Sequence, residues 1–148
     1  MSRGLLRRFA FTGGILFVVA AVLLLSSCNY ELPPLLKGAS SAGGWEGGCP
    51  RPPEYADLPL ALSPELNARL TNQFPKGSPE TGLVAELRRN GFTMSAPCAE
   101  DSTIHKATFT EPQHWYGVFF PTSASVYWRI DPGKNLVWTM GFVDHTGP

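Results

Sequence analysis

The residue types that most often carry chemistry form no recognised catalytic or metal-binding motif in this sequence. The three histidines, His105, His114 and His145, lie outside the HExxH and Cys-x-x-Cys contexts that often hold zinc. Glu100 and Asp101 form an acidic pair, but adjacent acidic residues in a polar loop are usually solvated. No GxSxG motif points to a serine nucleophile. We therefore predict no catalytic residues, metal ligands or cofactors, while a triad that assembles only in space stays open.

The first cysteine, Cys28, follows the most apolar run of the chain. A short stretch containing Arg3, Arg7 and Arg8 precedes the uncharged 17-residue run FAFTGGILFVVAAVLLL, which is followed by SSC. A basic start, an apolar middle and small residues before a cut are typical of a secretory signal. The residues LSSC resemble the bacterial lipobox. This resemblance implies a lipoprotein signal peptide at residues 1–27 and lipid attachment to Cys28.

The alternative to cleavage is a single-pass anchor, because Phe9 to Leu25 is just long enough to span a bilayer. Lipid on Cys28 would hold the protein at the membrane, since each buried methylene group contributes about 0.8 kcal/mol. Asn29 follows this cysteine, where an aspartate would resemble an inner-membrane retention signal. We therefore favour the outer membrane over the inner membrane, with the domain facing the periplasm.

The other two cysteines form an even pair once Cys28 is assigned to lipid. In an oxidising compartment this predicts a disulfide between Cys49 and Cys98. The bond would close a loop that stabilises the fold by roughly 4 kcal/mol in the chain-entropy model. Residues 28–62 are rich in Pro, Gly and Ser, which indicates a tether after the lipidated cysteine. The folded domain is then expected at residues 63–148.

The charge balance argues against a nucleic-acid partner. The chain carries 12 Lys and Arg residues against 12 Asp and Glu residues. Removal of the three arginines of the signal leaves a mature chain with a net charge near −3. Beyond Arg88 and Arg89 the mature chain has no basic cluster that could follow a phosphate backbone.

Two helices are predicted at the start of the folded domain. The stretch SPELNARLTNQF (63–74) begins with a serine cap and a proline that fits the first helical position, and its apolar residues recur every four positions. The stretch SPETGLVAELRRNG (78–91) repeats this pattern. Ser78 is its expected cap, and Gly91 suits the left-handed conformation that ends a helix.

Strands are predicted after the second helix, because the apolar period changes from 3.6 to 2. We expect strands at 102–110 and 114–120 and a short one in FTMSA (92–96). The clearest pair is SVYWRI (125–130) and LVWTMGFV (136–143), joined by DPGKN, which is typical of a type I turn.

The alternation along this pair predicts the faces of the sheet. In the first strand Val126 and Trp128 share an apolar side, and in the second Trp138, Met140 and Phe142 share one. Two helices packed on the apolar sides would bury both. We therefore predict an α+β fold, with two N-terminal helices packed on an antiparallel sheet of three to five strands.

This order and its motifs resemble a known group. FPKGSPETGLVAELRRNGF resembles the capped helix of the SmpA/OmlA (BamE) lipoproteins, and VYWRIDPGKNLVWTMGF resembles their terminal hairpin. The beta-lactamase inhibitor protein fold shares the arrangement. The resemblance covers about residues 63–143 and implies a lipid-anchored scaffold or binder without catalysis. The long tether, the Cys49/Cys98 pair and the segment 95–113 depart from the pattern.

Aromatic residues provide a candidate partner surface. Trp115 and Tyr116 are adjacent, so in a strand they face opposite sides, and Tyr127 and Arg129 share the side opposite Trp128. An exposed patch of Tyr, Trp and Arg side chains is typical of interface hot spots. The alternative is ordinary packing, in which a second layer or the tether covers that face.

These observations predict a bacterial envelope lipoprotein with a non-catalytic binding or scaffold domain. Its partners would be the membrane, through the lipid, and another envelope protein, in outer-membrane assembly or maintenance. The alternatives are a periplasmic inhibitor or ligand-binding module and, third, a hydrolase whose triad would join His105 or His114 to a serine and a carboxylate.

Overall fold

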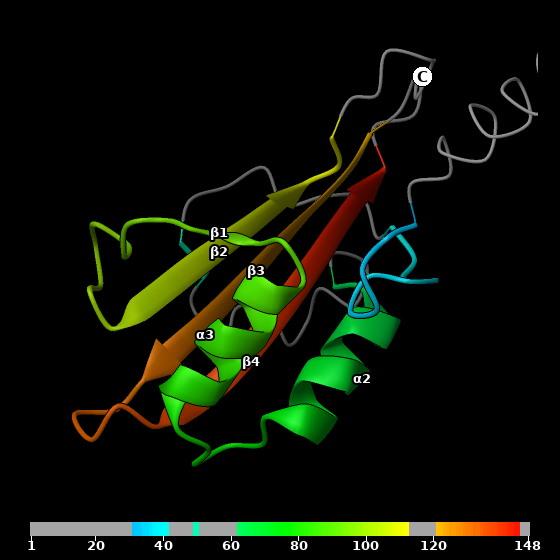
Figure 1. The fold of residues 1–148 in the computed structure, drawn as a ribbon. Helices are drawn as coiled ribbons and strands as arrows, with labels where there is room; N and C mark the ends of the chain where they lie inside the picture. The colour runs from blue at the N-terminus through cyan, green and yellow to red at the C-terminus, as the bar shows by residue number, and fades with distance from the viewer. Residues whose placement is uncertain (1–30, 42–48, 51–61, 113–120, 146–148) are drawn as a thin grey trace, which may run out of the picture. The chain divides into compact units, whose positions relative to one another are not determined.

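The protein has an α+β fold, seen in a computed structural model that describes residues 31–41, 49–50, 62–112 and 121–145 (Figure 1). Within these residues, two helices precede four strands that form an antiparallel sheet in the order β1-β2-β3-β4. The elements are α2 (Pro64–Gln73), α3 (Glu80–Arg89), β1 (Thr93–Met94), β2 (Ile104–Thr110), β3 (Thr122–Ile130) and β4 (Leu136–His145). The predicted α+β class is confirmed.

Several predicted features lie outside the described residues. These are the signal peptide and Cys28, the strand expected at 114–120 with its Trp115 and Tyr116, and His114. Among the described residues, no helix has both the length and the apolar character needed to cross a bilayer. The chain separates into two compact units, Met1–Glu31 and Leu32–Pro148, and the account below concerns the second.

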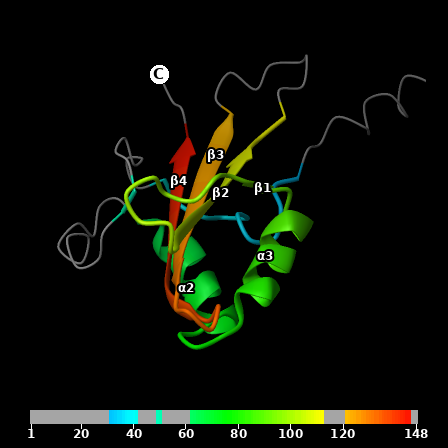
Figure 2. The same ribbon diagram turned by 90° about the vertical axis from the view of Figure 1, so that its left-hand side faces the viewer.

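Both helices pack on one face of the sheet (Figures 1 and 2). The helices contribute four fully buried leucines to this interface, and β2, β3 and β4 contribute the side chains that the ladder places on the same face. The set comprises Leu66, Leu70, Leu83, Leu87, Ala107, Phe109, Ala124, Val126, Trp128 and Val143, all buried. The leucine spacing therefore predicted the core side of both helices.

The apolar sides of β3 and β4 do not face the same layer. Trp128 lies opposite Thr139 in the ladder, so the apolar stripe of β4 falls on the face away from the helices. The expectation that helices bury both stripes is wrong. The register shifts between Arg129 and Ile130, next to the turn in which Lys134 adopts φ 59. A one-residue shift moves a whole strand's side chains to the other face.

A second apolar cluster covers that other face. Its buried members are Cys98, Ile104, Tyr127 and Phe142, with Cys49, Leu62, Trp138 and Met140 packed against them. The predicted disulfide between Cys49 and Cys98 is present, with a Cα–Cα distance of 5.8 Å. It attaches the chain around residue 49 to the sheet. Among the described residues, the helices therefore cover one face of the sheet, and Cys49, Cys98 and Leu62 pack on the other.

The segment 32–41 packs on the helices, although we expected it within the tether. Leu35, Leu36 and Ala39 are buried. The Leu35 N–H donates to Asn90 Oδ1 at 3.0 Å, and the Arg69 guanidinium donates to the Leu35 carbonyl at 2.8 Å. The folded part therefore begins near Leu32. The side chains of Leu35 and Leu36 are buried, and the hydrogen bonds above satisfy the main-chain groups of Leu35.

One carboxylate fixes the end of this segment. The N–H and hydroxyl of Ser40 donate to Glu65 Oε2 at 3.0 and 2.7 Å. The main-chain bond from Ser40 is the largest cause that lowers the pKa of Glu65 to about 2, and the hydroxyl bond acts in the same direction. Docking of the segment is therefore linked to the ionised form of Glu65.

Candidate binding groove

A groove of about 420 Å³ opens between α3 and the helix-side face of the sheet. This volume lies in the range of small-molecule sites, about 300–1,000 Å³. Its α3 wall consists of Glu80, Thr81, Val84, Ala85 and Arg88, and its sheet side consists of Met94, Ser95, His105, Lys106 and Trp128. The lining of the groove thus combines four apolar residues with six polar or charged ones.

The helical period explains how one helix serves both the core and the groove. Leu83 and Leu87 form the buried stripe of α3. Glu80, Val84 and Arg88 follow the same spacing on the adjacent stripe, and all three line the groove.

The start of α3 is held by the β3–β4 turn. Ser78 was predicted to cap α3, but Pro79 occupies the cap position, and the Ser78 carbonyl accepts from the Leu136 N–H at 2.8 Å instead. The Glu80 N–H donates to the Lys134 carbonyl at 3.0 Å. These main-chain bonds fix the position of Glu80 relative to the sheet.

Glu80 connects the helix to two aromatic side chains of the sheet. Its Oε1 accepts from Trp128 Nε1 at 2.8 Å and lies 2.9 Å from His105 Nδ1. His105 and Trp128 are opposite each other on β2 and β3, so their rings lie together at 5.6 Å. Because an ionised carboxylate only accepts hydrogen bonds, the geometry assigns the proton to Nδ1 and leaves Nε2 as the other imidazole nitrogen for a ligand.

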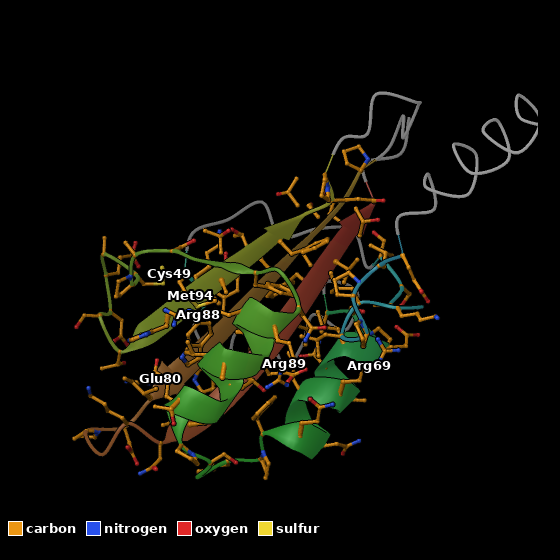
Figure 3. All side chains as sticks on the ribbon, viewed as in Figure 1. Cys49, Arg69, Glu80, Arg88, Arg89 and Met94 are labelled. Carbon is orange, nitrogen blue, oxygen red and sulfur yellow. A yellow bond between two sulfur atoms is a disulfide. The ribbon has the colours of Figure 1, made fainter. Side chains whose placement is uncertain are left out.

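The charges of the groove are separated along α3. Glu80 lies at the first residue of the helix and Arg88 two turns later, a rise of about 12 Å. Figure 3 shows Glu80 and Arg88 at opposite ends of this side of the helix, with Arg88 near Met94. Lys106 also borders the groove, but its ammonium lies 5.2 Å from the centre of the Tyr127 ring. That ring is on the other face.

The groove brings together a serine, a histidine and a carboxylate, but not in the arrangement of a triad. The Ser95 N–H donates to the Lys106 carbonyl at 2.9 Å, which places Ser95 opposite Lys106 in the ladder. Side chains alternate along a strand, so Ser95 is on the face of Lys106 and His105 is on the opposite face. The side chain of Ser95 therefore points away from the Glu80–His105 pair and is not placed as its nucleophile.

Tyr127 and Arg129 are the two members of the predicted partner surface that the structure describes. Tyr127 is only 3% exposed and packs edge-on against Phe142, with ring centres 5.8 Å apart, in the cluster that also contains Cys98. Burial removes it from any exposed patch, which corrects the prediction. Arg129 is exposed and interacts with Thr103 and Asp101.

Sequence reasoning missed the groove. Glu80 was not among the predicted site residues, and His105 lies in no recognised motif. The available signal was the polar stripe of Glu80 and Arg88 beside the leucine stripe of α3. Nothing local connects Glu80 to His105, which is 25 positions further along the chain.

Comparisons with protein-family models, with curated proteins and with solved structures each found no match. The resemblance to the SmpA/OmlA (BamE) lipoproteins therefore stays a prediction. The function must be argued from the groove and from the cysteines.

Proposed function

We propose that the protein is a bacterial envelope lipoprotein whose domain binds a ligand in the groove beside α3, without catalysis. The groove itself is the observation that carries the binding function. Its lining joins apolar side chains, namely Val84, Ala85, Met94 and Trp128, with charged groups that include Glu80 and Arg88. Ligand sites are typically apolar clefts in which a few placed polar groups set the orientation.

The cysteines support the location. The chain has three cysteines, and Cys49 and Cys98 are joined in a disulfide. Cys28 is therefore the cysteine left for lipid, directly after the apolar run. Disulfides persist in oxidising compartments, which agrees with export. We place the domain on the periplasmic side of the outer membrane.

Mass spectrometry of the mature protein tests the location. We expect an amino terminus at Cys28 that carries lipid, together with intact Cys49–Cys98 linkage. Unmodified Cys28 in a chain that keeps residues 1–27 would contradict the lipoprotein assignment and favour the single-pass anchor.

Site-specific photocrosslinking in cells tests the groove. A photoreactive residue at Thr81, which lines the groove, should give crosslinks that the same residue at Thr71 does not. Both threonines are exposed and helical, but Thr71 belongs to α2 and lies outside the groove lining. Equal crosslinking at the two positions, or none at either, would contradict binding in the groove.

Hydrolysis is the alternative function, because Glu80 contacts the His105 imidazole and Ser95 also lines the groove, but the ladder directs Ser95 and His105 to opposite faces of the sheet. A serine-directed fluorophosphonate probe distinguishes the two functions. Labelling that is lost in both Ser95→Ala and His105→Gln variants would establish a hydrolase and contradict the non-catalytic proposal.

A further inference from the structure

We propose that the ligand of this groove is a short extended peptide with free ends. Its amino terminus would lie at Glu80 and its carboxylate at Arg88. This inference rests on the proposed binding function and names the class of ligand. It follows from the charges at the two ends of the groove, the distance between them and the main-chain groups of β1.

The Glu80 end suits an ammonium group. Glu80 Oε1 is occupied by Trp128 and His105, whereas Oε2 has no hydrogen-bond partner among the described residues. The side chain of Glu80 is only 15% exposed, so an ammonium group there would be poorly screened by water. The two neighbouring donors also hold the carboxylate in one orientation, which lowers the cost of ordering it on binding.

The Arg88 end suits a carboxylate. Within the described part of the chain Arg88 has no ion pair, whereas its neighbour Arg89 is paired with Glu86. Arg89 also lies on the side of α3 nearer to α2, away from the groove (Figure 3). A guanidinium group binds a carboxylate through two parallel hydrogen bonds, which fixes the ligand's direction as well as its position.

The length of the groove selects a peptide of a few residues. Glu80 and Arg88 are separated by a rise of about 12 Å along α3. An extended chain advances about 3.3 Å per residue, so three or four residues span this distance. The side chains between the charged ends include Val84 and Met94, which suit small apolar side chains.

The edge of the sheet offers main-chain partners for such a peptide. β1 is an edge strand of the sheet. The Ser95 N–H donates to the Lys106 carbonyl on β2. Because successive main-chain groups of a strand point to opposite sides, the N–H and carbonyl of Met94 point away from β2. These two groups therefore face the open edge of the sheet, and Met94 lines the groove. An added extended peptide could pair with them, as in β-strand addition at an exposed edge.

The probe is tetraalanine in four forms: free, N-acetylated, C-amidated and blocked at both ends. Each is titrated by calorimetry into the full mature chain in detergent micelles. We expect the free peptide to bind with a Kd between about 10 μM and 1 mM, the range for a ligand of this size. Blocking either end should weaken binding about tenfold, because each removes one charge-assisted contact.

Variants assign the ends. Arg88→Gln should weaken the binding of free tetraalanine about tenfold and leave the binding of the C-amidated form unchanged. Glu80→Gln should also weaken the binding of free tetraalanine about tenfold, but leave the binding of the N-acetylated form unchanged. Arg89→Gln is the matched control and should change neither. Circular dichroism confirms that each variant is folded.

Three outcomes would overturn the inference: equal affinity for the free and doubly blocked peptides, an Arg88→Gln effect that does not depend on the carboxylate, or no binding at 10 mM, about ten times the upper expected Kd. Any of these with groove-specific crosslinking at Thr81 would refute the peptide and leave the binding function standing. Loss of the crosslinking as well would refute both.

Discussion

Replacement of Gly141 by alanine tests the packing of α2 on the sheet most directly. A Cβ atom at this position would lie 2.5 Å from Cγ and Cδ2 of Leu66 and 3.1 Å from Cδ1 of Leu70. Both leucines are fully buried, so neither can turn away. Carbon atoms in contact normally lie about 3.5–4.0 Å apart, and α2 would have to move by about 1 Å.

Such a movement would also disturb the hydrogen bonds that join α2 to β4. The Gly141 carbonyl accepts from the Ser63 N–H at 3.1 Å and from Asn67 Nδ2 at 2.8 Å, and the Gly141 N–H donates to Asn67 Oδ1 at 3.0 Å. Overpacking typically costs about 1–3 kcal/mol, and each weakened hydrogen bond up to about 1 kcal/mol. The lower entropy of the unfolded alanine chain returns about 0.4–1 kcal/mol. We expect a net loss of about 2–4 kcal/mol.

Urea unfolding followed by circular dichroism, with the disulfide intact, measures this loss. Gly82→Ala is the control, because its Cβ would lie 3.7 Å from the nearest atom of Phe74, an ordinary contact. It should stabilise α3 by up to about 1 kcal/mol. In the double variant Gly141→Ala/Leu66→Ala the two closest contacts, both with Leu66, are removed. The loss of stability of the double variant should therefore be smaller than the sum of the losses of the two single variants. Strict additivity, or an unchanged stability in Gly141→Ala alone, would refute the packing argument.

Three further predictions concern the rest of the fold. Because the pKa of Glu65 is lowered from 4.5 to about 2, its ionised form stabilises the docked segment above pH 4.5, and this contribution should be lost as the pH falls toward 2. Glu65→Gln should flatten the pH dependence of unfolding in that window, and an unchanged profile would contradict the linkage. Joint replacement of Cys49 and Cys98 by alanine should lower the free energy of unfolding by about 4 kcal/mol in chemical denaturation; a loss below about 1 kcal/mol would mean that the cross-link does not constrain the unfolded chain. Lys134→Gly should raise the free energy of unfolding by about 0.5 kcal/mol, because Lys134 has φ 59, which favours glycine. Lys76→Gly is the control and should lower the free energy of unfolding, because Lys76 has a negative φ. A change of the same sign in both variants would exclude a backbone cause.

The features that depend on neighbouring residues could be predicted from the sequence. Apolar spacing located both helices, and the left-handed φ of Gly91 agrees with its predicted role as a stop. The Asp-Pro-Gly-Lys turn also forms, with the Lys134 N–H bonded to the Asp131 carbonyl at 2.9 Å. The cysteine count predicted the disulfide that joins Cys49 to Cys98. The helices and the turn follow from local residue preferences, and the disulfide follows from the number of cysteines. Tertiary contacts did not override these preferences.

The tertiary structure decided which faces are covered and which side chains meet. The alternation of side chains along β3 and β4 assigns each residue to one of two faces. Because both faces are partly apolar, the sequence does not predict which face the helices cover. The register settled this and buried Tyr127 on the other face. The segment 32–41 resembles a linker in composition, yet Leu35 and Leu36 are buried by residues far away in the chain.

The groove belongs to the same category. Glu80, His105 and Trp128 come from α3, β2 and β3, and no local spacing relates them. They meet because the β3–β4 turn fixes the start of α3 and the ladder places His105 opposite Trp128. Local propensity selects elements, whereas a site assembled across elements exists only once register and docking have fixed their positions.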